Sequence, residues 1–419
     1  MIKRNVFILI IFLGFLFFPP LSQGLQEELT LEECINLALK QNPLILSSLE
    51  QYQASLARVN QAKALAQPSL DYDNDMQPKF FNLKGTAETY VGFSQSLEFP
   101  GKRVTRGKIA AKESQEILQD IDLLKLDIIF LVKEAFYDLL LAKEKLQYAE
   151  QDQLLAQDFL QKAELKYSAG DVAKVEALRA QVEASKTANE VKVAQNEVRL
   201  ATARLNFLLA KKKYDLLEIQ GTLKRPKSSI DLNTLIQRAL ARRPELKRLN
   251  LSLEKEGLQK KQATMGYFPD FDLSLSKHWL EGEGNFWDFA LSVPIPLFFW
   301  QPIKGEIAEA QANIASLNRE AEHLKNAITL EVEEAHMNAV TAQNQITLFE
   351  DEIITQAEEV YNMFLFSYQE GEIGSIELID ARRTLLEARK SYADALYNHG
   401  IALAALEKSI GQTFEGESL

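Results

Sequence analysis

The longest pattern in the chain is helical. Apolar side chains recur at alternating steps of four and three residues, the spacing of a coiled-coil seam, at Ile117, Ile121, Leu124, Ile128, Leu131 and Ala135. The seam continues from Leu139 after one extra step of four, an insertion that locally unwinds a supercoil. We therefore expect a helix over about 104–167, ~96 Å long at ~1.5 Å per residue, which turns back into a second helix.

Four other segments alternate between apolar and polar residues, as β-strands do. They cover about 69–78, 86–99, 270–279 and 286–296. In the last two, the residues expected to face lipid are Phe271, Leu273, Leu275, Phe289, Leu291 and Val293, with Lys277 as an interruption. Strands of about 9 to 11 residues with one apolar and one polar face are typical of a membrane barrel. Two amphipathic hairpins of a soluble sheet are the alternative.

The tryptophans fit the membrane interpretation. All three lie in or just after the last two strands, as an aromatic girdle requires: Trp279, Trp287 and Trp300. Four strands cannot close a barrel, and open sheet edges are not tolerated in lipid. Closure must then come from further copies of the chain, with 8 strands in a dimer or 12 in a trimer.

The chain repeats itself with a spacing of 201 residues. Leu31, Ile35, Ala38, Leu39 and Pro43 are matched by Leu232, Ile236, Ala239, Leu240 and Pro244. We expect two structural units, 25–228 and 229–419. Each should hold a short helix, a medium helix, two strands and a long helical hairpin; the expected helical ranges are 31–41 and 232–242, 44–66 and 245–265, and 104–211 and 303–411.

Composition and charge narrow the choice of partners. The 419 residues include 47 Lys and Arg against 59 Asp and Glu, a formal net charge of −12, which argues against nucleic acid as a partner. The one cysteine, Cys34, cannot form an internal disulfide. Its counterpart in the second unit is a leucine, so we expect it to be a small buried apolar residue.

The N-terminus has the pattern of an export signal. Lys3 and Arg4 precede an apolar run over 6–18, and small residues surround a cleavage site expected after Gly24. The predicted signal peptide is therefore 1–24. The alternative, a membrane anchor, is disfavoured because the apolar run is too short to cross a hydrocarbon core about 30 Å thick.

Taken together, these features resemble the TolC-type outer-membrane factors of tripartite efflux and secretion systems. The resemblance covers nearly the whole mature chain. It depends on the duplicated order of helix, two strands and long hairpin, and on the pairs Tyr167/Gly170 and Tyr368/Gly371 before the final helices. It implies a homotrimer with a 12-stranded barrel in outer-membrane lipid and a 12-helix tunnel in the periplasm of a Gram-negative bacterium. It also implies that the turns at these pairs dock a periplasmic adaptor coupled to an inner-membrane transporter.

Two stretches resemble the heavy-metal efflux branch of this family, 97–103 (LEFPGKR) and 293–299 (VPIPLFF). Heavy-metal cations are therefore one expected cargo. Many outer members of that branch carry an N-terminal lipid, and this sequence departs from them there. A channel for drug efflux or type I protein secretion and a soluble periplasmic coiled-coil scaffold are the alternative functions.

Glu377 and Asp380 are the candidate gate. They lie three residues apart just after Gly371, so they share one face of a helix. Three copies around an axis would form a ring of six carboxylates, a constriction that attracts cations. They also match the acidic positions that similar channels use at the periplasmic entrance. An ordinary solvated acidic face is the alternative, and the sequence does not decide which faces Arg382 and Arg383 take.

No enzyme motif stands out, and we expect no catalytic residue and no cofactor. The pairs Glu320/His323 and Glu333/His336 have the spacing of di-metal bundles, but both lie on one helix. They are expected to be solvated surface, and no metal site is predicted. His278 and His399 have no clustered partners in the sequence.

Overall fold

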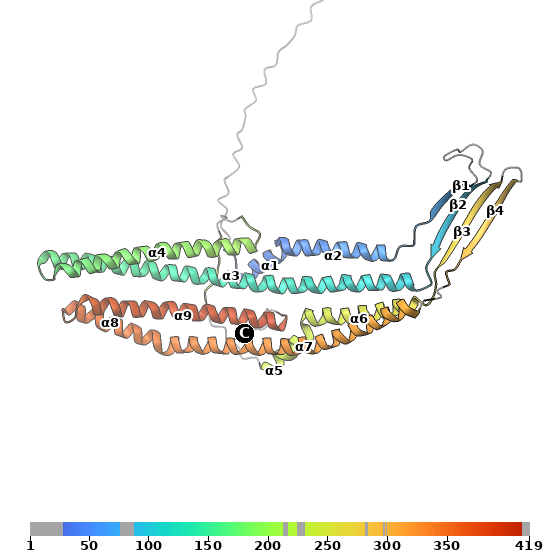
Figure 1. Cartoon of the computed structure of the whole chain (residues 1–419). Coiled ribbons are helices and arrows are strands. Elements are labelled where there is room, and N and C mark those ends of the chain that lie inside the picture. The colour runs from blue at the N-terminus through green and yellow to red at the C-terminus, as the bar shows by residue number, and fades with distance from the viewer. Residues whose placement is uncertain are drawn as a thin grey trace, which may run out of the picture.

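The structure is a computed structural model that describes residues 28–75, 88–212, 217–223, 231–280, 284–295, 298 and 300–412. The expected signal peptide, 1–24, lies outside these residues. The chain forms a long rod of helices with a sheet at one end and two helical hairpin tips at the other (Figure 1). None of the helices in the described ranges is both long and apolar enough to cross a bilayer.

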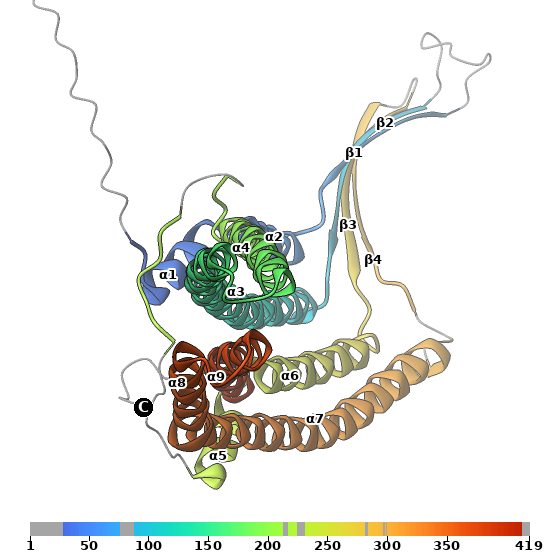
Figure 2. The same ribbon diagram turned by 90° about the vertical axis from the view of Figure 1, so that its left-hand side faces the viewer.

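Two long hairpins build the rod. In the first, α3 (Lys102–Ala169) turns into α4 (Lys174–Leu208). In the second, α7 (Trp300–Leu348), a π-helical segment (Phe349–Ile353) and α8 (Ile354–Glu370) run on to the turn before α9 (Ser375–Ile410). Figure 2 shows α3 and α4 stacked on α8 and α9. The predicted hairpins are therefore present, and they begin two to three residues earlier than expected.

Shorter helices complete the rod: α2 (Pro43–Ala62) and α6 (Pro244–Met265) run toward the sheet, and α1 (Leu31–Gln41) and α5 (Leu232–Arg242) lie beside the middle of the rod (Figure 1). The predicted bounds of α1 and α5 are confirmed, and Thr30 and Glu33 form a capping box at the start of α1. The predicted end of α2 at 66 is wrong. Arg106 of α3 donates to the carbonyl of Ala62 over 2.8 Å, which caps the helix there and frees the chain to extend.

The predicted seam of α3 is only partly correct. Ile121, Ile128 and Ala135 are buried, but Leu131 is 40% exposed. The reason is that α3 packs against several helices, α2, α4, α6 and α9, so its buried positions do not follow a single coiled-coil seam. Cys34 is fully buried, as predicted, and burial raises the pKa of its thiol to about 11.

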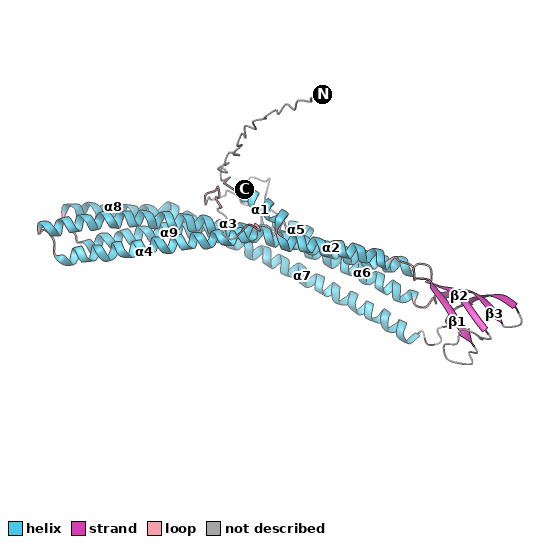
Figure 3. Ribbon diagram, turned by 90° about the horizontal axis from the view of Figure 1, so that it is seen from above, coloured by secondary structure: helices cyan, strands magenta, loops and turns pink. Residues whose placement is uncertain are grey.

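The sheet contains β1 (Ser69–Asp75), β2 (Glu88–Leu97), β3 (Phe271–Leu280) and β4 (Gly284–Ser292), antiparallel in that order. Figure 3 shows it at the end of the rod opposite the hairpin tips. The expected strand residues 76–78 and 86–87 lie outside the described residues. The prediction that the last strand reaches 296, with Val293 in it, is wrong: β4 ends at Ser292, and Pro294 has no N–H to continue the ladder.

Candidate functional site

One face of the sheet is apolar across all four strands. Leu70, Phe93, Leu275 and Phe289 form one register row, and Leu273 and Leu291 are paired in the row nearer the helices. Phe289 and Leu291 are 68% and 60% exposed in the single chain. The expected lipid-facing residues of β3 and β4 therefore share a face, and Val293 lies just beyond it.

The opposite face is polar and acidic. Its charged residues in the described strands include Asp71, Asp73, Glu88, Asp272 and Asp288. On these strands the face has no Lys or Arg. The carboxylates on this face give the space in front of it a negative electrostatic potential.

His278 lies on this acidic face and does have partners, contrary to the expectation from sequence. Its Nε2 is 2.5 Å from Oε1 of Glu88, and its Nδ1 is 3.7 Å from Oδ2 of Asp288. Tyr90 stacks on the imidazole at 4.2 Å between ring centroids. These residues lie on three different strands, so only the register of the sheet brings them together.

Each hairpin tip turns at a glycine in the left-handed conformation. Gly170 has φ 87° and Gly371 has φ 82°. The N–H of Asp171 donates to the carbonyl of Lys166 over 3.0 Å, and the N–H of Glu372 donates to that of Ser367 over 2.9 Å. Each tip is thus a compact cap that leads directly into the next helix.

The two tip tyrosines differ in their surroundings. Tyr167 is 44% exposed. Tyr368 packs across to the first hairpin, with its ring 5.6 Å from that of Phe159 and beneath Nζ of Lys166 at 4.9 Å. Burial raises the pKa of Tyr368. The structure therefore places Tyr167 on the surface of its tip and Tyr368 between the hairpins.

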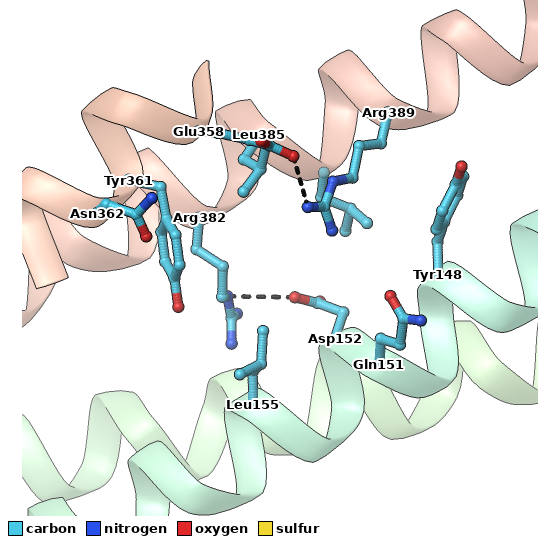
Figure 4. A pocket seen from close by; sticks show the side chains of 11 residues that line it. Tyr148, Gln151, Asp152, Leu155, Glu358, Tyr361, Asn362, Arg382, Leu385 and Arg389 are labelled. Atoms are coloured by element: carbon cyan, nitrogen blue, oxygen red, sulfur yellow. Dashed lines mark hydrogen bonds and ion pairs between the residues drawn. The ribbon is translucent and has the colours of Figure 1, made fainter. Parts of the chain in front are cut away.

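Arg382 joins the two hairpins about two turns into α9. Its guanidinium lies 3.3 Å from Asp152 of α3 and donates to Glu183 of α4 over 2.6 Å. Arg382 and Asp152 are both buried. They line a pocket of about 260 Å³ between the hairpins, and Figure 4 shows the guanidinium pointing toward the carboxylate. We call Arg382, Asp152 and Glu183 the inter-hairpin clasp.

Opposing effects act on the pKa of the Asp152 carboxyl in the clasp. Burial raises the pKa of its carboxyl, Arg382 opposes this rise, and Glu190 and Glu183 add to it. The net shift of the pKa is upward, so Arg382 offsets only part of the rise that burial and the neighbouring acids cause. The clasp was not found from sequence, because Asp152 and Glu183 belong to no motif and lie far from Arg382 along the chain.

Further ion pairs join the hairpins toward the middle of the rod. Lys390 lies 3.7 Å from Glu190, Lys145 is 2.8 Å from Asp394, and Lys408 is 2.8 Å from Asp127. Lys133 and Glu407 form a buried pair. At the tip, Ser375 donates to Glu176. Much of the contact between the two hairpins is therefore polar.

The candidate gate residues lie on the exposed side of α9. Glu377 is in the first turn of the helix, where a carboxylate is favoured by the helix dipole. Asp380 is paired with Arg383 on the same surface. Arg382 and Arg383 thus take different faces: Arg382 is buried in the clasp, and Arg383 is exposed beside the two acids.

The other candidate residues do not form a metal site. In the described part of the chain, no group of three or more His, Cys, Asp or Glu side chains is placed to hold a metal ion. Glu320, His323 and Glu333 are exposed on α7. His278 contacts its two carboxylates through opposite ring nitrogens, so they do not converge on one point.

A long helical rod that ends in strands with an apolar outer face defines the class of outer-membrane channels. The chain belongs to the outer membrane efflux protein family, whose model matches residues 34–211 and 235–412. The two matches start 201 residues apart, the spacing of the sequence repeat. The chain is therefore an outer-membrane efflux channel of a Gram-negative bacterium, with its helical rod in the periplasm.

Individual relatives agree with the family. The chain is 24% identical over 415 residues to the cobalt-zinc-cadmium resistance protein CzcC of Cupriavidus metallidurans, covering 94% of this chain and 92% of that protein. It is 22% identical to nodulation protein T of Rhizobium leguminosarum bv. trifolii, covering 91% and 85%. The crystal structure of CusC matches with a TM-score of 0.76 at 18% identity, covering 91% of this chain and 92% of that one. This family consists of channels rather than enzymes.

Proposed function

We propose that three copies of the chain close into one channel that carries divalent heavy-metal cations across the outer membrane. Periplasmic adaptors would dock on the hairpin tips and connect the channel to an inner-membrane pump. One observation supports this assembly. The sheet has two complementary open sides, and so has the rod.

The open sides of the sheet are β1 and β4, each paired on one side only within the described chain. An unpaired strand in lipid must find a partner, and β4 of one copy can supply it to β1 of the next. The helical rod repeats this arrangement. Exposed apolar residues follow α4 at one side and α8 at the other: Val182, Val193, Leu200 and Phe207, and Val360, Met363 and Phe366.

The gate proposal combines the exposed acids with the clasp. Around a threefold axis, Glu377 and Asp380 would form a ring of like charges that repel one another, so a closed ring needs an opposing restraint. The clasp can supply it, because Arg382 holds the start of α9 against α3 and α4 of the first hairpin. An adaptor that separated the hairpins at this level would release the ring.

Docking is assigned to the two tip turns. Gly170, Gly371 and the exposed Tyr167 would form the contact surface of the tips, and Tyr368 would set the position of its turn by packing on Phe159. The helix that follows each glycine begins at the surface of the tip, so its free N–H groups are available to a partner.

The acidic residues of the sheet and of the gate support divalent cations as the proposed cargo. The acidic face of the sheet would line the barrel and, with the gate acids, would give the channel a negative potential at both ends. CzcC is named for resistance to cobalt, zinc and cadmium.

Metal tolerance tests the proposed cargo. A strain that lacks the chain should lose tolerance to zinc, cobalt or cadmium and regain it with the intact gene. Sensitivity to hydrophobic drugs with unchanged metal tolerance would instead indicate a drug-efflux channel. Native mass spectrometry of the purified channel tests the assembly, and a monomer or dimer would overturn the proposed trimer.

A further inference from the structure

Lys277 is a charged residue on the apolar face of the sheet. It lies in β3, and its register row contains Tyr72 of β1, Val91 of β2 and Trp287 of β4. A lysine among lipid-facing side chains is costly near the centre of a bilayer.

The apolar face of the sheet becomes polar beyond the row of Lys277. The row nearer the helices is entirely apolar, with Leu70, Phe93, Leu275 and Phe289. The row farther from the helices holds Asn74, Thr89, Trp279 and Asn285. The helical rod is in the periplasm, so the far end of the strands faces the exterior. The row of Lys277 thus marks the boundary between hydrocarbon and headgroups in the outer leaflet.

Two tryptophans hold the lysine at this boundary. Nζ of Lys277 lies 4.9 Å from the ring centroid of Trp279, two residues along the strand, and 5.9 Å from that of Trp287, its cross-strand partner. Such contacts orient an ammonium group but leave its N–H donors available. Among the residues that the structure describes, Lys277 has no carboxylate partner and no hydrogen bond. The site therefore presents an oriented cation with free donors toward the lipid.

We propose that Lys277, Trp279 and Trp287 form a binding site for the phosphate of an anionic lipid headgroup in the outer leaflet. The ammonium group pairs with the phosphate, and the two indole rings lie along the upper acyl chains and the glycerol or sugar region. Three copies of the chain would carry three such sites around the barrel. This inference depends on the outer-membrane location and not on the proposed cargo or gate.

Tryptophan fluorescence tests the site, because the chain has three tryptophans. In a Trp300→Phe background, the remaining emission comes from Trp279 and Trp287. The full-length channel is placed in phosphatidylcholine vesicles that contain a minor amount of brominated phosphatidylglycerol or of brominated phosphatidylcholine. Quenching should favour the anionic quencher by about fivefold, in line with the usual contribution of one Lys beside an anionic surface.

Substitutions of Lys277 show whether its charge or its packing produces the preference for the anionic lipid. Lys277→Leu should reduce the preference to nearly none, and Lys277→Arg should keep it. Lys325→Leu, which removes an exposed lysine of α7 far from the strands, should leave it unchanged. Assembly of every variant is checked by native mass spectrometry, and Lys277→Gln replaces any Leu variant that does not assemble.

Three results would overturn the proposal. The first is equal quenching of the parent channel by both lipids, and the second is an unchanged preference in the assembled Lys277→Leu channel. The third is saturable binding of inorganic phosphate by the detergent-solubilised channel with the same dependence on Lys277. That result would indicate a site for free phosphate rather than for a lipid.

Discussion

Arg382 of α9 donates to Glu183 of α4 over 2.6 Å, and the two residues lie 199 positions apart in the chain. This contact and that of Arg382 with Asp152 join the second repeat to the first close to the hairpin tips. A restraint in this place acts where the channel is proposed to be narrowest.

Removal of the clasp arginine should both destabilise and open the channel. Arg382→Ala leaves Asp152 buried without its cation, which costs about 3–5 kcal/mol of unfolding free energy. Urea titration measures this cost, and single-channel recording should show a larger conductance. Arg383→Ala is the matched control, because Arg383 is exposed and should change stability by at most about 0.5 kcal/mol. Equal effects of the two changes would contradict the assigned faces.

Asp152 should make stability depend on pH. Its pKa in the folded chain lies above the ordinary value of 3.8, so between the two values the folded chain binds more protons than the unfolded chain. The unfolding free energy contributed by this group therefore falls as the pH rises from about 3.8 through the raised folded-state pKa. Asp152→Asn should remove this slope, and urea titrations from acidic to neutral pH measure the difference. An identical slope in the variant would contradict the prediction.

The gate acids should make the channel cation-selective. Replacement of both Glu377 and Asp380 by Ala should weaken block by divalent cations and reduce cation selectivity in planar bilayers. Glu197→Ala, which removes an exposed acid of α4 well above the tip, should change neither quantity. If the double variant keeps the conductance, selectivity and block of the parent, these carboxylates are a solvated surface.

The two faces of β4 should respond differently to charge. Leu291→Arg places a cation on the apolar face and should cost about 2–4 kcal/mol if the residue lies near the bilayer midplane. Ser292→Arg points to the acidic face and should be tolerated. The yield of heat-resistant oligomer in outer-membrane fractions measures assembly, and equal loss for both variants would refute the face assignment.

Gly371 should be needed because its backbone conformation is unfavourable for other residues, and not because a side chain there would clash with a neighbour. A Cβ at Gly371 would meet nothing within 4 Å, but its φ of 82° is unfavourable for valine, at a cost of about 1–3 kcal/mol. Gly371→Val should therefore distort the tip and weaken crosslinking to the adaptor while the trimer persists. Gly305→Val, at a helical position that is equally open, is the control. Normal crosslinking with a lost trimer would place this turn in the assembly interface.

The sequence predicted those parts of the fold that local chemistry determines. The capping box at Thr30 sets the start of α1, Pro43 sets its end, and the repeat places α5 201 residues later. The strand faces follow from alternation alone, and the lack of an N–H at Pro294 explains why β4 ends at Ser292 and not at 296.

Features that depend on distant partners could not be predicted. Leu131 has the spacing of a buried seam residue, yet α3 packs on two sides and leaves it exposed. Arg382 and Arg383 are chemically identical neighbours, and only the position of α3 and α4 distinguishes them. The carboxylates around His278 come from other strands, so their proximity is a property of the register.

The ion pairs between the hairpins have a consequence for repeated cycles of transport. Where Lys145 meets Asp394 and Lys408 meets Asp127, separation exposes charged groups that water solvates readily. These partly exposed pairs therefore oppose a parting of the hairpins only weakly, and they can form again with little change in solvation free energy.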